Sequence, residues 1–190
     1  MARPLSDDKR IAILDAAAEV VASQGVGATT AKIAKGARVA EGTLFTYFDS
    51  KDVLLNQLYV ALKQDLAAAM IEGFPSGASL RERVRHVWGR YLDWGADQPA
   101  KRKALRQLGV SDRITETSRA LAGDGLRDIR AMIEESRAAG VLRDQPPALT
   151  AAIMESLADT MLEFIAREPL KRDTYRNAGF EAFWNAVSTS

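Results

Sequence analysis

The sequence predicts an all-α protein: a small N-terminal domain of three helices followed by a helical bundle. Apolar residues recur at three- and four-residue intervals along most of the chain, which is the period of a helix with one buried face. No segment alternates convincingly with the period of two that marks a strand, and glycine or proline clusters separate the helical stretches. The expected domains are residues 1–50 and residues 51–190, linked by a helix over residues 50–72.

The first helix is expected between Ser6 and Gly25. Ser6 can cap it by accepting hydrogen bonds from unpaired backbone N–H groups, and Asp7 and Asp8 suit the positive end of the helix dipole. Gly25 and Gly27 end the helix. Its predicted buried stripe consists of Ile11, Leu14, Ala18 and Val21.

Residues 29–48 predict two short helices joined by a tight turn. Thr29 or Thr30 can cap the first, whose apolar stripe is Ile33, Ala34 and Ala37. In the second helix Leu44 and Phe48, four residues apart, can pack inward. The side chains expected to point outward are Glu41, Thr43, Thr46 and Tyr47. Such a pair is typical of a helix-turn-helix, which lays its second helix in the DNA major groove.

The next helix is long and carries a regular leucine repeat. Ser50 is expected to cap it, and it runs to about Glu72 before the turn-forming residues 73–77. The repeat consists of Leu54, Leu58, Leu62 and Leu66. Because this helix begins beside the helix-turn-helix and enters the rest of the chain, it is the natural lever between the two domains.

Five further helices follow from the same periodicity. Proline opens two of them, as expected for the first helical turn, and glycine or proline ends most of them. They are expected from Ser79 to about Gly95, from Pro99 to about Gly109, from Ile114 through Ile133 until Gly140, from Pro146-Pro147 to Glu168-Pro169, and from a cap at Asp173 to the end.

The segment over residues 33–54 closely resembles the DNA-binding signature of TetR family transcriptional regulators. The matching run is Ile33-Ala34, Ala37 through Phe48, Ser50-Lys51-Asp52 and Leu54, without a gap. The resemblance implies a sequence-specific DNA-binding regulator, a repressor released from a palindromic operator by a small effector. It also implies that residues 1–50 bind DNA and that residues 51–190 bind the effector and form a homodimer.

Two positions depart from the family pattern. Arg38 stands in the turn where the family often has glycine, which costs on the order of 1 kcal/mol if its φ is positive. Phe45 stands where the family usually has a phosphate-binding tyrosine, so it packs on the sugar-phosphate or the core and the phosphate contacts fall to Thr30, Tyr47 and Lys51. The full predicted DNA-binding set is Thr30, Lys32, Ala40, Glu41, Gly42, Thr43, Phe45, Thr46, Tyr47 and Lys51.

The net charge of +1 is small for a nucleic-acid-binding protein, but its distribution matters more than its sum. Residues 29–51 carry four basic and two acidic side chains. A dimer doubles this excess on one face, which predicts salt-sensitive but not extreme DNA binding.

The middle helices supply aromatic, aliphatic and sulfur-containing side chains that suit an apolar effector cavity. Taken singly, each is better explained by core packing, and only the family resemblance favours a pocket. A hydrophobic or aromatic effector is expected. The candidate residues are Leu62, Trp88, Tyr91, Leu105, Leu108, Ile129, Met132, Met154, Leu157 and Met161.

The last two helices are apolar or small around more of their circumference than packing in one chain requires, which indicates an interface with a second copy. The alternative is that these residues complete the core of the monomer. The candidates are Ala151, Ala158, Leu162, Phe180, Phe183, Trp184 and Val187.

Catalysis and metal binding have no evident residues. The chain has no cysteine, and its one histidine, His86, has no second ligand or nucleophile near it in sequence. Asp124 and Asp128 are better explained as a solvated helix face than as paired carboxylates. No cofactor is expected. No apolar run approaches the ~20 residues that span a bilayer, so no membrane partner is expected and the cytoplasm is the expected location. The alternative function is a DNA-binding dimer controlled by a protein partner.

Overall fold

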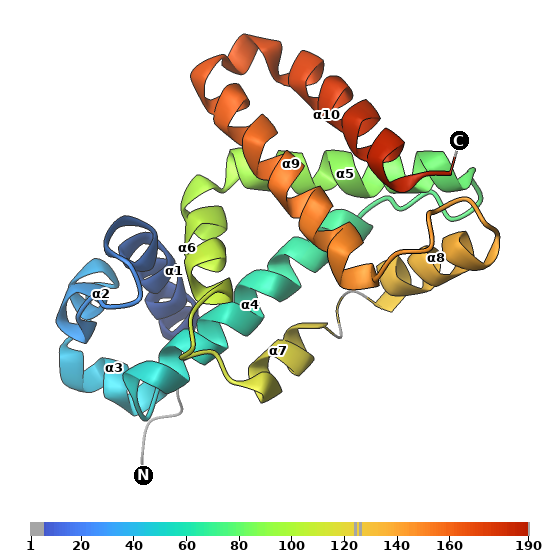
Figure 1. The fold of residues 1–190 in the computed structure, drawn as a ribbon. Coiled ribbons are helices and arrows are strands. Elements are labelled where there is room, and N and C mark those ends of the chain that lie inside the picture. Colours follow the sequence, from blue (N-terminus) through green and yellow to red (C-terminus); the bar gives the residue numbers. More distant parts are fainter. Residues whose placement is uncertain (1–5, 124, 126, 190) are drawn as a thin grey trace. The chain divides into compact units, whose positions relative to one another are not determined.

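The computed structural model describes residues 6–123, 125 and 127–189, and it confirms the all-α fold class (Figure 1). Within those ranges the only extended pairing is an isolated bridge between Leu142 and Ser188. The helices are α1 (Asp7–Gln24), α2 (Thr30–Gly36), α3 (Glu41–Tyr47), α4 (Lys51–Ile71), α5 (Leu80–Asp97), α6 (Pro99–Gly109), α7 (Glu116–Gly123), α8 (Arg127–Ala138), α9 (Pro147–Arg167), the 3₁₀ helix η2 (Pro169–Lys171) and α10 (Arg172–Val187).

The chain packs as two compact units. Unit 1 comprises residues 1–65 and 98–124, and unit 2 comprises residues 66–97 and 125–190. This division differs from the expected boundary at residue 50, because α6 packs against α1 within unit 1. The functional division into residues 1–50 and 51–190 remains a prediction.

The core of unit 1 is built on α1, which packs against both α2 and α6. Leu14, Ala18 and Val21 are buried as predicted. Ile11 is 54% exposed, so its predicted place in the buried stripe was wrong. Because two helices cover α1, its buried face is wide and includes Ile13. Ser6 occupies the N-cap position, yet its side chain makes no capping bond, so that prediction was also wrong.

Helix α4 follows the prediction closely. The Ser50 hydroxyl accepts a hydrogen bond from the backbone N–H of Val53 at 3.2 Å, which confirms the cap. The four leucines of the repeat, Leu54, Leu58, Leu62 and Leu66, are all buried. None of the helices in the described part of the chain is long and apolar enough to cross a bilayer.

The helix expected from Ile114 through Ile133 is in fact two helices, α7 and α8. Glycine is a poor helix former, and Gly123 and Gly125 lie where the two helices separate. At Gly125 a Cβ atom would lie 3.0 Å from the Cβ of Ala67, a tight contact that a side chain could make only if its neighbour shifted slightly. Asp124 lies outside the described residues, and the side chain of Asp128 is likewise not described.

Unit 2 is centred on Trp88, which is 1% exposed. Its ring stacks on Phe183 with centroids 5.6 Å apart, and its indole N–H donates to the backbone oxygen of Arg176 at 2.9 Å. Helices α9 and α10 form an antiparallel pair (Figure 1), and both pack against α5. The last helix begins at Arg172, after η2, so Asp173 lies in its first turn and does not cap it as expected.

The burial of this core corrects most of the predicted dimer interface. Within a single chain Ala158, Leu162, Phe180, Phe183, Trp184 and Val187 are buried, whereas Ala151 is exposed. Helices α5, α9 and α10 pack on one another, and Phe183 stacks on Trp88 of α5, so the buried side chains complete the core of the monomer, which was the alternative.

Candidate nucleic-acid interface

Helices α2 and α3 form a helix-turn-helix whose turn is fixed by backbone hydrogen bonds. The Val39 N–H donates to the Ala34 oxygen at 3.0 Å and the Arg38 N–H donates to the Lys35 oxygen at 3.1 Å. This pattern is a Schellman motif, which requires a left-handed residue after the helix. Arg38 takes that role with φ of 56°, so the condition stated for the cost of a side chain at this turn is met. The turn therefore holds α3 at a set angle to α2.

Replacing Arg38 by glycine is expected to raise the free energy of unfolding by about 1 kcal/mol, because glycine adopts positive φ without a Cβ clash. Urea denaturation followed by circular dichroism measures this change. Arg38→Ala is the matched control, since it removes the same charge but keeps the Cβ atom. The strain argument fails if the glycine variant is no more stable than the alanine variant.

Buried side chains anchor α3 from behind. Ile33, Leu44 and Phe48 are all 0% exposed, which confirms the inward positions predicted for them. The opposite face is open: Glu41, Gly42, Phe45 and Thr46 are exposed, and Thr43 and Tyr47 are half-buried. A Cβ atom on Gly42 would meet no atom of the described residues within 4 Å. The start of α3 can therefore approach a flat or concave partner closely.

The polar groups at the start of α3 are bonded to their neighbours. The Thr30 hydroxyl donates to the carboxylate of Glu41 at 2.5 Å, linking the first turns of α2 and α3. The Thr46 hydroxyl donates to the backbone oxygen of Gly42 at 3.1 Å, a common local bond in helices. Thr30 was predicted to contact a phosphate and Glu41 a base. Both residues must therefore break the hydrogen bond between them when they bind DNA.

The remaining phosphate candidates lie around the same surface. The Tyr47 hydroxyl accepts the Ser6 N–H at 3.0 Å, which leaves its own O–H free to donate. Lys32 is exposed and donates to the side-chain oxygen of Gln24. Phe45 is 43% exposed, so it faces solvent rather than the core. Ala40 precedes α3 as its N-cap residue and is exposed.

Lys51 at the start of α4 is half-buried, and this burial lowers its pKa below the ordinary lysine value. The neighbouring Arg113 cation lowers the pKa further, while the Asp52 carboxylate opposes both effects. Arg113 forms an ion pair with Asp52, the residue after Lys51, so both cations lie at the start of α4. Arg113 was not among the predicted site residues, and it lies 61 residues from its ion-pair partner Asp52 in the sequence.

The predicted effector residues are divided between the two units. Leu62, Leu105 and Leu108 are buried in unit 1, while Trp88 and Met132 are buried in unit 2. The half-buried members, all in unit 2, are Tyr91, Ile129, Met154, Leu157 and Met161. Whether the set forms one effector cavity therefore stays a prediction.

Each unit contains a cavity of its own. The cavity in unit 1 measures about 460 Å³ and lies between Arg10 of α1, the outer face of α4, and α7. The cavity in unit 2 measures about 210 Å³ and is lined by Trp88 and by Arg85, Asp173, Arg176, Asn177 and Phe180. Trp88 is the one predicted effector residue that lines either of these two cavities.

No three acidic or histidine side chains of the described residues gather to hold a metal ion. His86 packs edge-on against Phe74, with ring centroids 5.9 Å apart. The open, hydrogen-bonding face of α3 is the surface to be compared with other proteins.

Known proteins share both the helix-turn-helix and the whole fold. The model of the family "Bacterial regulatory proteins, tetR family" matches residues 13–58, from α1 into α4. The crystal structure of a tetR family transcription regulator from Shewanella sp. PV-4 is 31% identical, with a TM-score of 0.85 over 96% of this chain and 99% of that chain. The HTH-type transcriptional repressor NicS from Pseudomonas putida is 27% identical over 144 residues, which are 73% of this chain and 68% of that protein.

The fold is also shared with a ligand-bound regulator. LfrR from Mycobacterium smegmatis, solved in complex with proflavine, is 21% identical over 93% of this chain and 95% of that chain, with a TM-score of 0.69. The family match contains the helix-turn-helix, so the resemblance inferred from residues 33–54 is confirmed. The protein is a DNA-binding transcriptional regulator and not an enzyme. The chain belongs to the TetR family of bacterial transcriptional regulators.

Proposed function

We propose that this regulator is a cytoplasmic repressor that binds a palindromic operator as a homodimer and is released by a small, mostly apolar effector. The observation that carries the proposal is α3 itself, which is anchored by the buried Leu44 and Phe48 and exposes small and hydrogen-bonding groups. The similarity to the repressor NicS supports repression over activation, because NicS aligns with most of this chain.

Base recognition falls to the first turn of α3. The methyl group of Thr43 can contact a thymine methyl, and the carboxylate of Glu41 can accept a hydrogen bond from cytosine N4. Gly42 lets the helix backbone approach the base edges, since nothing in the described residues fills the space beside it. Thr30, Tyr47 and Lys51 fix the register of the helix on the phosphates.

Dimerisation places two copies of α3 about one turn of DNA apart, ~34 Å, as a palindrome requires. We assign the interface to the exposed small residues of α9 and α10, because the larger residues predicted for it, such as Phe180, Phe183 and Trp184, are buried in the monomer. Short side chains let helices approach closely, and they give two copies a self-complementary face. The exposed small residues are Ala151, Ala152, Ser156, Ala178, Ala182 and Ala186.

Ala182→Arg is expected to convert the dimer to a monomer and to weaken operator binding by at least about tenfold, because one α3 alone holds the operator poorly. Position 182 is exposed in the monomer, so the fold should be unaffected. Sedimentation equilibrium measures the oligomeric state. Ala131→Arg, at an exposed position of α8, is the matched control. A dimer that persists in the Ala182 variant rejects the assigned interface.

Release requires an effector that binds the DNA-incompetent state better, since a ligand shifts an equilibrium only by its differential affinity for the two states. LfrR supports a hydrophobic or aromatic effector, because it has this fold and was solved with proflavine. Helix α4 would carry the change, since it begins beside α3 and contains Leu62 of the predicted effector set. If no apolar compound that binds the protein alters operator affinity, control by a protein partner becomes the better proposal.

Selection from random duplex DNA tests the proposal without knowledge of the regulated gene. The expected result is enrichment of a palindrome whose half-sites lie about 10 base pairs apart, centre to centre. Recovery of a single unrepeated half-site would contradict dimeric recognition, and the absence of any enriched sequence would contradict specific DNA binding.

A further inference from the structure

We propose that Arg113, from the segment between α6 and α7, is a further DNA-binding residue that contacts the phosphate backbone beside Lys51. The inference rests on the proposed function and deepens it, because it adds a contact from outside the helix-turn-helix. The segment belongs to unit 1, as do α3 and the start of α4.

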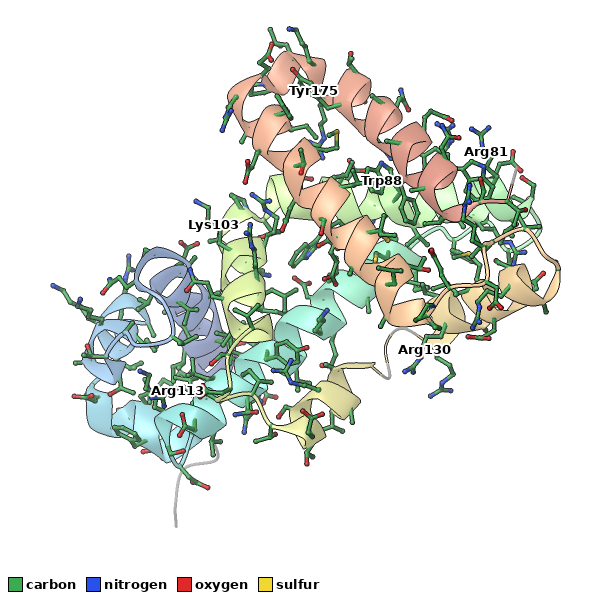
Figure 2. All side chains as sticks on the ribbon, in the orientation of Figure 1. Arg81, Trp88, Lys103, Arg113, Arg130 and Tyr175 are labelled. Carbon is green, nitrogen blue, oxygen red and sulfur yellow. The ribbon has the colours of Figure 1, made fainter. Side chains whose placement is uncertain are left out.

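The side chain of Arg113 lies at the start of α4. Its Nη1 atom lies 2.7 Å from the Oδ1 atom of Asp52, in the first turn of that helix. Figure 2 labels Arg113 beside this end of α4. Lys51 precedes Asp52, so Arg113 contacts the residue next to the lysine to which the family resemblance assigns a phosphate.

Hydrogen bonds hold the backbone on both sides of residue 114 against α4. The side-chain amide of Asn56 donates to the Arg113 oxygen at 2.9 Å, and its oxygen accepts the Thr115 N–H at 2.9 Å. Ile114 between them is 3% exposed. The backbone that carries the Arg113 side chain is therefore fixed to Asn56, which lies in α4 shortly after Lys51.

The same segment is also braced from α7. The guanidinium group of Arg119 donates to the backbone oxygens of Gly109 and Ser111, at 3.0 and 3.1 Å. These bonds close the segment on itself, so residues 109–115 are held at both ends. A cation on a fixed backbone loses less entropy on binding a phosphate than one on a free loop.

The ion pair between Arg113 and Asp52 is weak enough for a DNA phosphate to take the place of Asp52. The side chains of Arg113 and Asp52 are 45% and 59% exposed, and exposed ion pairs contribute little to stability. A guanidinium group can donate two parallel hydrogen bonds to a phosphate. The approach of a phosphate also relieves the repulsion between Lys51 and Arg113, which is the second cause, after burial, of the lowered pKa of Lys51. Asp52 thus holds the Arg113 side chain in place until a DNA phosphate replaces the Asp52 carboxylate as its partner.

The competing explanation is that Arg113 only ties its segment to Asp52. The two explanations differ in the effect of Asp52→Asn, which breaks the ion pair but keeps the cation. A purely structural role predicts that Arg113→Gln and Asp52→Asn both weaken DNA binding. A phosphate contact predicts opposite signs: Arg113→Gln weakens binding, and Asp52→Asn strengthens it, with less effect when both substitutions are present.

The experiment is a titration of random-sequence duplex DNA, by fluorescence anisotropy, between ~50 and ~200 mM salt. Arg113→Gln is expected to reduce the slope of log affinity against log salt by about one per protomer. For a dimer, the loss of affinity across this salt range then becomes about tenfold smaller. Arg113→Lys should keep most of the slope. Arg130→Gln on α8 is the charge-matched control and should leave it unchanged.

An unchanged slope in Arg113→Gln, or weaker binding in Asp52→Asn, overturns the inference. Either result leaves the proposed function intact, provided that the wild-type protein binds DNA in a salt-dependent manner. If the wild-type protein does not bind at either salt concentration, the proposed function itself fails.

Discussion

The double substitution Thr43→Ala and Tyr47→Phe lowers operator affinity by about a hundredfold or more. Each residue is expected to make a base or phosphate contact worth about 1–3 kcal/mol, and each contact occurs once in each protomer. The fold should survive, because both side chains are only half-buried and phenylalanine keeps the aromatic ring. Fluorescence anisotropy with a labelled operator measures the loss.

Thr117→Ala is the matched control, because Thr117 is an exposed threonine of α7 in the same unit. It should bind the operator like the wild-type protein. If the double variant retains its affinity while the control behaves normally, α3 does not present the recognition face assigned to it. If the double variant loses operator affinity but keeps its affinity for random DNA, the lost contacts are to bases.

Trp88→Ala should lower the free energy of unfolding by about 3–5 kcal/mol, the usual cost of removing a fully buried aromatic side chain. Trp88 is 1% exposed, its ring stacks on Phe183, and its N–H is bonded to Arg176. The substitution leaves a cavity and also removes the hydrogen bond from the indole N–H to the Arg176 oxygen. Since whole domains are stable by only about 5–15 kcal/mol, unit 2 should become marginal.

Urea denaturation followed by circular dichroism measures this effect. Leu170→Ala is the control, because Leu170 is a fully exposed apolar residue and its truncation should change stability by less than about 0.5 kcal/mol. A loss of under about 1 kcal/mol in the Trp88 variant would show that Trp88 is not the centre of the unit 2 core.

Local chemistry explains why so many helix limits could be predicted from the sequence. Ser50 caps α4, and Pro99 and Pro147 begin α6 and α9, because these signals act within one turn of the helix. The position of Arg38 in a recognised turn raised the question of a positive φ, but only the structure shows that its φ is 56°. Most of the DNA-binding set depended on the family resemblance, since periodicity indicates only which residues face outward.

The predictions that were wrong depended on which helices pack together, which the local sequence does not determine. Whether Phe180 or Phe183 faces a second copy or the core depends on which helices pack together, and α5 covers them in this fold. Ile11 is exposed because α2 and α6 select another face of α1. Arg113 had no sequence signal at all, because its partner Asp52 is distant in the chain. Such residues become visible only once the segments are folded together.

The most direct test of the account is a titration of the wild-type protein against a labelled fragment of its own upstream DNA and against random DNA of equal length, at ~50 and ~200 mM salt. The account predicts tight, salt-sensitive binding with a preference of at least about a thousandfold for the upstream fragment. Equal affinity for both DNAs at both salt concentrations would contradict the claim that α3 reads an operator in that fragment.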